Sequence, residues 1–234
     1  MSVDDTAKWA GAIATFIAVI VALLKEEIIR LWRKPDLVAR VKLCAPDCHK
    51  TRVTFLNHIT RQPDVVDCYY FRLWVENKGN LRAEKVQVFA SKLLKKHTDG
   101  VYREEQHFLP MNLKWSHSQI PIGRPEIFAD GISPEIGKHC DLGHINHPSK
   151  RSLLGEDLPG LQQTNTILAL DLEVSPNTLS HLIPPGEYRL EVKLAATNSK
   201  PIIKIIEMDI KGSWYDDESE MFSKGINMNE TSGG

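Results

Sequence analysis

The chain has 234 residues, of which 42% are hydrophobic and 25% are charged, a composition typical of globular proteins. The 29 Lys and Arg residues nearly balance the 30 Asp and Glu residues, so no excess charge attracts the chain to nucleic acid. Four cysteines are too few for a disulfide scaffold, so the chain suits a reducing compartment as well as an oxidising one. One domain of roughly 200 residues is expected after an unusual N-terminal segment.

That segment contains an uncharged run, residues 9–24, with the sequence WAGAIATFIAVIVALL. As a helix it is about 24 Å long, and Lys8 and Lys25 flank it, so it approaches the thickness of a hydrocarbon core. Acidic residues precede the run and no small-residue cleavage site follows it, which disfavours a signal peptide. We expect a transmembrane helix with a juxtamembrane extension over residues 9–35, ended by Pro35; a helix buried in a soluble core is the alternative.

The charges around the run predict its orientation. Downstream lie Lys25, Arg30, Arg33, Lys34 and Arg40, whereas only Lys8 precedes it. The positive-inside rule therefore places the remainder of the chain in the cytoplasm, below the inner membrane, and makes residues 1–8 a short extracytoplasmic tail.

Small residues recur every four positions within the run, at Ala10, Ala14, Ala18 and Ala22. This spacing gives one face of a helix along which two helices can approach closely. We expect the protein to form a homo-oligomer through this face, and a chance distribution of alanines is the alternative.

From residue 37 onward, apolar and polar residues alternate as in half-buried strands. Residues 68–90 predict two strands joined by a turn at Asn77-Lys78-Gly79-Asn80, and further strands are expected at 101–108, 138–142 and 167–174. A Pro-Gly turn at 185–186 precedes the clearest strand, EYRLEVKLAAT, and a second hairpin strand follows. The pattern predicts a mainly β, antiparallel sandwich over residues 36–214.

Residues 215–234 are expected to lie outside the sandwich. The acidic segment DDESEMF predicts a short helix, and the last ten residues contain little core material, so we expect a disordered tail.

The segments FRLWVENKGNLRAEKVQVF, LKW, ISPEIGKHCDLGHI and IPPGEYRLEVKLAATNSKPIIKIIEMDIKGSW resemble the immunoglobulin-like, CARDB-type β-sandwich of uncharacterised prokaryotic proteins. The resemblance covers about residues 66–214 and rests on structural turns and alternation. It implies an adhesive or recognition module without catalysis. By fold-level analogy it also suggests a cytosolic sensor on a membrane helix, as among prokaryotic antiviral defence effectors.

Metal-ligating residue types occur in two sequence clusters, Cys44 with Cys48 and Cys140 with His144. Zinc binds four thiolate or imidazole ligands, which these residues could supply, but their spacing is not the usual paired spacing of zinc sites. A zinc site is therefore one hypothesis, and the alternative is that Cys140 packs in the core as a small hydrophobic residue. No other cofactor is expected.

Residues 110–165 are rich in Pro, Gly, Ser and His and show little periodicity. We expect a long recognition loop there, because binding residues of sandwiches concentrate in loops. Its candidate residues are Trp115, Phe128, His139, His144 and His147.

No nucleophile, phosphate-binding or metalloprotease motif is present, so an enzyme is not expected. The function we expect is that of a single-pass membrane sensor or effector whose cytosolic sandwich recognises a protein or small-molecule ligand. A passive anchor or scaffold for a complex is the first alternative, and a zinc-binding domain is the second.

Overall fold

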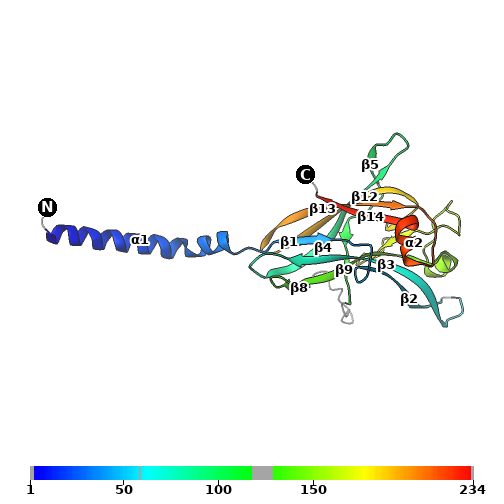
Figure 1. Ribbon diagram of the computed structural model, residues 1–234, viewed down its shortest axis with the longest axis horizontal. Coiled ribbons are helices and arrows are strands. Elements are labelled where there is room, and N and C mark those ends of the chain that lie inside the picture. The colour runs from blue at the N-terminus through cyan, green and yellow to red at the C-terminus, as the bar shows by residue number, and fades with distance from the viewer. Residues whose placement is uncertain (1–2, 58, 118–128, 233–234) are drawn as a thin grey trace.

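The computed structural model describes residues 3–57, 59–117 and 129–232. A long N-terminal helix extends away from a β-rich body (Figure 1). The described elements are α1 (Val3–Trp32), β1 (Leu37–Arg40), β2 (Cys48–Leu56), β3 (Pro63–Asn77), β4 (Ala83–Lys96), β5 (Tyr102–Glu104), β6 (Met111–Asn112), β7 (Lys114–Trp115), β8 (Ala129–Ile132), β9 (Gly137–Asn146), the 3-10 helix η1 (Pro148–Leu154), β10 (Leu168–Leu170), β11 (Leu182–Ile183), β12 (Gly186–Ala196), β13 (Ser199–Ile210), α2 (Glu218–Glu220), the π-helix η2 (Met221–Gly225) and β14 (Ile226–Ser232).

The strands form two antiparallel sheets. The first has the order β1-β3-β9-β10-β11, with β2 beside β3 and β7 beside β9. The second has the order β14-β13-β12-β4-β5, with β6 and β8 beside β4. The predicted mainly β, antiparallel, two-sheet fold is confirmed.

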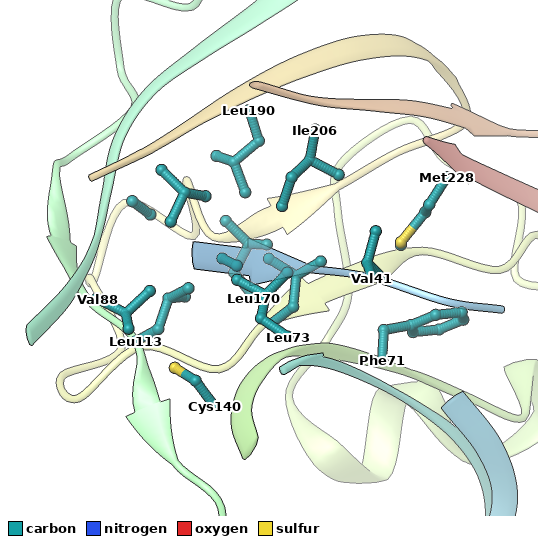
Figure 2. Close-up of a cluster of buried hydrophobic side chains, with 14 of the residues drawn as sticks. Val41, Phe71, Leu73, Val88, Leu113, Cys140, Leu170, Leu190, Ile206 and Met228 are labelled. Atoms are coloured by element: carbon teal, nitrogen blue, oxygen red, sulfur yellow. The ribbon is translucent and has the colours of Figure 1, made fainter. Parts of the chain in front are cut away.

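The hydrophobic core lies between the two sheets, because each long strand buries alternate residues. On β12, Tyr188, Leu190, Val192 and Leu194 are at most 2% exposed, whereas the residues between them face outward. Figure 2 shows side chains of both sheets meeting, among them Leu73, Leu170 and Cys140 from the first sheet and Val88, Leu190, Ile206 and Met228 from the second.

Helix α1 ends at Trp32, in agreement with the predicted end before Pro35. Its large apolar side chains are exposed, including Trp9, Phe16 and Leu23, which are 66%, 66% and 75% accessible. Over the part of the chain that the structure describes, no helix combines the length and hydropathy required of a membrane span.

The chain after α1 is bonded to the turn between β3 and β4. The side chain of Asn80 donates to the carbonyl oxygen of Trp32 (2.8 Å) and accepts from the amide of Lys34 (3.0 Å). The backbones also touch at Gly79, where a Cβ atom would lie 2.2 Å from the oxygen of Lys34. A glycine is therefore needed here for close approach of the two segments.

Asn77 completes this junction from inside the fold. The residue is fully buried, and its side-chain oxygen accepts from the amides of Asp36 and Gly79, both at 3.0 Å. Its side-chain nitrogen donates to the carbonyl oxygens of Leu81 (2.7 Å) and Ile132 (2.9 Å). All four hydrogen bonds of one buried amide thus connect the linker, the turn and β8.

Two predictions about irregular regions are wrong. Residues 226–232 are not a disordered tail: they pair with β13 as β14, and Ile226 and Met228 are only 1% and 4% exposed. Residues 110–165 are not one long loop, because β6, β7, β9 and η1 lie within them. The short helix predicted near residues 216–222 is present as α2 and η2.

Candidate functional site

The outer face of the first sheet presents a row of polar residues on β9. His139, Asp141 and His144 lie opposite Trp74, Arg72 and Tyr70 of β3. Each facing pair occupies one face of an antiparallel sheet, and the three β3 residues alternate with the buried ones.

A β-bulge explains the spacing of this row. Phe71 pairs with Gly143 but Arg72 pairs with Asp141, so β9 has one extra residue at Leu142. The extra residue changes the alternation, and His144 returns to the face that Asp141 occupies.

At one end of the row, His139 forms a polar contact with a buried carboxylate. Its Nε2 atom lies 3.0 Å from Oδ1 of Asp47. Its ring packs edge-on against Trp74 at 4.8 Å, and the guanidinium of Arg40 lies 5.7 Å from the same indole. At this end of the row, Trp74 therefore contacts both the imidazole of His139 and the guanidinium of Arg40.

In the middle of the row, Asp141 accepts hydrogen bonds from Arg72 Nε (3.1 Å) and from the hydroxyl of Ser116. Burial raises the pKa of Asp141 above its ordinary value, although these two donors and the charge of Arg72 oppose the shift.

At the other end, His144 is held between two carboxylates. Its Nδ1 atom lies 3.0 Å from Asp171 Oδ1, and its Nε2 atom lies 3.0 Å from Glu156 Oε1. The same Glu156 oxygen accepts from Asn146 Nδ2 at 2.8 Å. Burial alone would lower the pKa of His144, but the hydrogen bonds and charges of Asp171 and Glu156 outweigh it and raise the pKa to about 10. At neutral pH the imidazole is therefore a cation that donates from both nitrogens. We call these three residues the His144 clasp.

Each carboxylate of the clasp is positioned by a local feature of the chain. Asp171 directly follows β10, and its amide donates to the carbonyl oxygen of Leu142 (3.2 Å). Glu156 follows Gly155, which ends η1 with a φ of 77° and turns the chain back toward β9. The amide of Glu156 donates to the carbonyl oxygen of Arg151 (3.1 Å).

Arg151 holds the segment that carries Glu156. It is 1% exposed, and its guanidinium donates to the carbonyl oxygens of Asn165 and Gln162, the latter at 3.3 Å. The carboxylate of Asp157 lies 3.7 Å from its Nε atom. A buried guanidinium thus connects η1 to residues 157–165.

A cavity of about 400 Å³ lies beside the clasp. Its lining includes His144, Glu156, Asp171, His181 and Lys114, together with apolar residues. Within the described chain, three buried atoms at this place have no hydrogen-bond partner: Glu156 Oε2, Asp171 Oδ2 and His181 Nδ1. Burial lowers the pKa of His181, so this imidazole is neutral at pH 7.

A second cavity, of about 610 Å³, lies beside His147. The ring of His147 packs edge-on against Trp214 at 4.9 Å, and its Nδ1 atom accepts from the amide of Ser149 at the start of η1. No Asp, Glu, Lys or Arg is among the lining residues. Of these two cavities, the one beside the clasp is therefore the one lined by charged side chains.

The structure does not assemble the predicted zinc ligands. Cys48 and Cys140 are fully buried, and the thiol of Cys140 donates to the carbonyl oxygen of Lys114 at 3.2 Å. Cys44 is exposed, and both nitrogens of His144 contact carboxylates. The described residues include no group of three or more metal-ligating side chains suited to a metal ion.

The other predicted site residues have separate places. Trp115 is 3% exposed and belongs to the core, so its assignment to a recognition surface is wrong. Phe128 lies outside the described residues. His139 and His144 are on a strand and not in a loop.

On α1, the predicted association face is only partly described. Ala14, Ala18 and Ala22 are exposed, whereas the side chain of Ala10 lies outside those that the structure describes. Association of helices through this face stays a prediction.

Glu156, Asp171 and His181 were not among the residues predicted from the sequence. The only local signals are that Asp171 is an acidic residue directly after an apolar strand and that Glu156 follows a glycine, Gly155, at a turn. No spacing in the sequence connects either residue to His144.

No protein-family model, curated protein or solved structure matches this chain. The resemblance to CARDB-type sandwiches therefore stays a prediction.

Proposed function

We propose that the protein is a membrane-anchored recognition protein. Helix α1 inserts into a lipid bilayer through residues 9–24, and the sandwich binds a ligand on the cytoplasmic side at the outer face of its first sheet. The observation that carries the proposal is the exposure of apolar side chains along a helix that extends away from the body (Figure 1).

The chemistry of α1 favours insertion over adsorption at a membrane surface. Large apolar residues from Trp9 to Leu24 are exposed over one broad side of the helix, and the other side carries the small residues Gly11, Ala14, Thr15, Ala18 and Ala22. An interfacial helix has a charged face, which this run lacks. The hydroxyl of Thr15 donates to the carbonyl oxygen of Gly11 (2.9 Å), so its proton is paired inside the helix, as lipid requires.

The junction supports a fixed placement of the sandwich below the membrane. Asn77, Gly79 and Asn80 connect the linker of residues 33–36 to the β3–β4 turn through side-chain hydrogen bonds and close backbone contact. These contacts attach the linker and the end of α1 to the sandwich.

The charged groups of the site favour binding over catalysis. An imidazolium with a pKa of about 10 cannot accept a proton at neutral pH, so His144 is unsuited to act as a general base. Burial raises the pKa of Cys48 to about 12 and also raises that of Cys140, so neither thiol is an activated nucleophile.

A matched pair of substitutions tests anchoring. Val19 on α1 and Val101 on the β4–β5 turn are 50% and 51% exposed. A lysine near the centre of a membrane helix costs about 3 kcal/mol of insertion free energy, whereas one at a solvent-exposed turn costs little. We expect Val19→Lys to move a large share of the full chain from the carbonate-resistant membrane fraction to the supernatant, and Val101→Lys to leave the fractionation unchanged. Identical fractionation of both variants and the wild type would contradict the proposal.

The orientation is tested with a thiol already present. Cys44 is exposed, while Cys48, Cys68 and Cys140 are fully buried. A membrane-impermeant maleimide should label the protein only after the cells are permeabilised, and Cys44→Ser should abolish the labelling. Labelling in intact cells would place the sandwich on the outer side and disprove the cytoplasmic assignment.

A further inference from the structure

We propose that the end of the sandwich nearest α1 docks on a membrane surface of anionic phospholipid. The inference rests on the proposed function, because it requires α1 to lie in a bilayer, and it adds the lipid class that this end binds. We call this end the basal face. It consists of the linker (33–36), the β3–β4 turn with the start of β4 (78–85), the β8–β9 turn (133–136) and the β12–β13 turn (197–200) (Figure 1).

Contacts between these segments hold them together beside the end of α1. The amide of Lys78 donates to the carbonyl oxygen of Asp36 (2.7 Å), which joins the β3–β4 turn to the linker. The side chain of Asn198 donates to the carbonyl oxygen of Arg82 (2.8 Å), which joins the β12–β13 turn to the β3–β4 turn. A Cβ atom at Gly131, just before the β8–β9 turn, would lie 2.2 Å from Nε of Arg82, so this side chain packs on β8. The four segments therefore share one end of the molecule.

The basal face has an excess of positive charge. Its exposed basic residues are Arg33, Lys34, Lys78, Arg82, Lys85 and Lys200. Its exposed acidic residues are Asp36, Glu84 and Glu135. Six positive charges against three negative ones give this face a net charge of +3, whereas the whole chain has a formal net charge of -1. The sign of the charge suits an anionic surface.

Most of these cations are not neutralised within the protein. In the described part of the chain, no ion pair involves Arg33, Lys34, Lys78, Arg82 or Lys200. Elsewhere on the sandwich, several lysines lie within 3.0 Å of a carboxylate oxygen: Lys50, Lys96, Lys150, Lys211 and Lys224. An anionic membrane would supply the missing countercharge, and each basic residue near such a surface strengthens binding about fivefold.

The position of the basal face fits contact with headgroups. Residues 25–32 continue α1 beyond the apolar run for about 12 Å, at 1.5 Å per residue. The headgroup layer is about 5–8 Å thick, so the face lies within one Debye length, about 8 Å, of its outer edge. Trp32, directly before the linker, and Ile136, in the β8–β9 turn, are 78% and 54% exposed and would leave water on contact with lipid.

Fluorescence quenching in nanodiscs tests the docking. A fluorophore on Ser133→Cys, in a Cys44→Ser background, reports contact with nitroxide-labelled headgroups, because a nitroxide quenches only at short range. Ser133 is exposed in the β8–β9 turn. The full chain is placed in nanodiscs of phosphatidylcholine alone or mixed with phosphatidylglycerol. We expect at least twofold more quenching in the anionic nanodiscs at low salt, and loss of this difference at high salt.

The same samples distinguish docking from anchoring. Co-elution of the chain with neutral nanodiscs reports anchoring alone. A chain that joins both kinds of nanodisc but is quenched equally in them would overturn docking and leave anchoring intact. A chain that joins neither would overturn both proposals.

Matched triple substitutions locate the contact. The basal variant combines Lys78→Gln, Arg82→Gln and Lys200→Gln. At about fivefold per cation, it should lower the ratio of docked to undocked sandwich about a hundredfold and abolish the extra quenching. The control removes three positive charges from the β2–β3 turn, from β4 beyond its start and from η2: Arg61→Gln, Lys92→Gln and Lys224→Gln. The control should keep the extra quenching.

Equal quenching of the two triple variants would overturn the proposal, whether both keep the response to anionic lipid or both lose it. Backbone amide spectra establish whether each variant is folded. If one is not, the comparison of lipids and salt concentrations on the otherwise native chain decides the question.

Discussion

His144 lies between two carboxylates that approach it from different elements. Asp171 extends from the end of β10 and Glu156 from the turn after η1, so the imidazolium connects three parts of the chain. Removing one partner of such a buried ionic group leaves an uncompensated charge, which typically costs about 3–5 kcal/mol. The clasp therefore keeps this wall of the cavity in one conformation.

The raised pKa of His144 predicts a pH dependence of stability. The unfolded chain releases this proton near pH 6.5, whereas the folded chain keeps it until about pH 10. The stabilisation is thus complete below pH 6.5 and is lost as the pH rises toward 10. We expect the free energy of unfolding, from urea titrations, to fall by up to about 1.4 kcal/mol per pH unit between pH 7 and 8, and this slope to disappear in His144→Gln.

Other titrating groups near His144 act outside this window. The pKa of Tyr70, whose ring centroid is 5.7 Å away, is raised by burial, and that of Cys68 is raised in the same way, so both matter only near pH 9 and above. His181 has a lowered pKa and affects stability in acid. The exposed His97 supplies a control, since His97→Gln should retain the slope; a slope retained in His144→Gln would contradict the assignment.

The sequence identified His144 but not its environment. Strict alternation along a strand would place His139 and His144 on opposite faces, because they are five residues apart. The bulge at Leu142 brings them to one face, and no sequence signal marks it. Glu156 and Asp171 reach His144 through long-range packing, which spacing in one sequence does not reveal.

The junction between α1 and the sandwich depends on close backbone contact at Gly79. Gly79→Ala would place a Cβ atom 2.2 Å from Lys34 O and 2.5 Å from Asp36 N, so the linker must separate from the turn. We expect hydrogen exchange at the amides of Asp36 and Lys78 to increase about tenfold, equivalent to ~1.4 kcal/mol, because their hydrogen bonds cross this contact.

Gly11→Ala is the matched control, since a Cβ there meets nothing within 4 Å. Its exchange pattern should equal that of the wild type. Wild-type exchange in Gly79→Ala would show that the linker does not depend on close contact with the turn.

Elements with strong local signals were predicted well, and elements that depend on neighbours were not. The β12–β13 hairpin was expected from the regular alternation of its first strand, which follows a Pro-Gly turn, and from a predicted turn at residues 198–201, and it is present. β14 was missed because Ile226 and Met228 are its only large apolar residues, and the strand forms by pairing with the already regular β13. β2 pairs with β3 and buries few of its residues, so its apolar–polar alternation is similarly weak.

At the scale of the whole molecule, the protein combines an apolar helix with a sandwich whose outer face holds fixed charges. The helix, the junction and the clasp are connected through the first sheet, since β1 follows the linker and pairs with β3, which pairs with β9. A ligand at the clasp would thus bind a sheet that is bonded to the helix. This arrangement has a function in recognition at a membrane only if α1 is anchored in lipid.

Depth measurement with spin labels in liposomes tests that claim most directly. One label is attached at Phe16→Cys in a Cys44→Ser background, and the other at the native, exposed Cys44. If α1 is inserted in lipid, the label at residue 16 is relaxed by oxygen and protected from a water-soluble nickel chelate, while the label at Cys44 shows the opposite. Equal access of the nickel chelate to both labels would show that α1 lies in water and would disprove membrane anchoring.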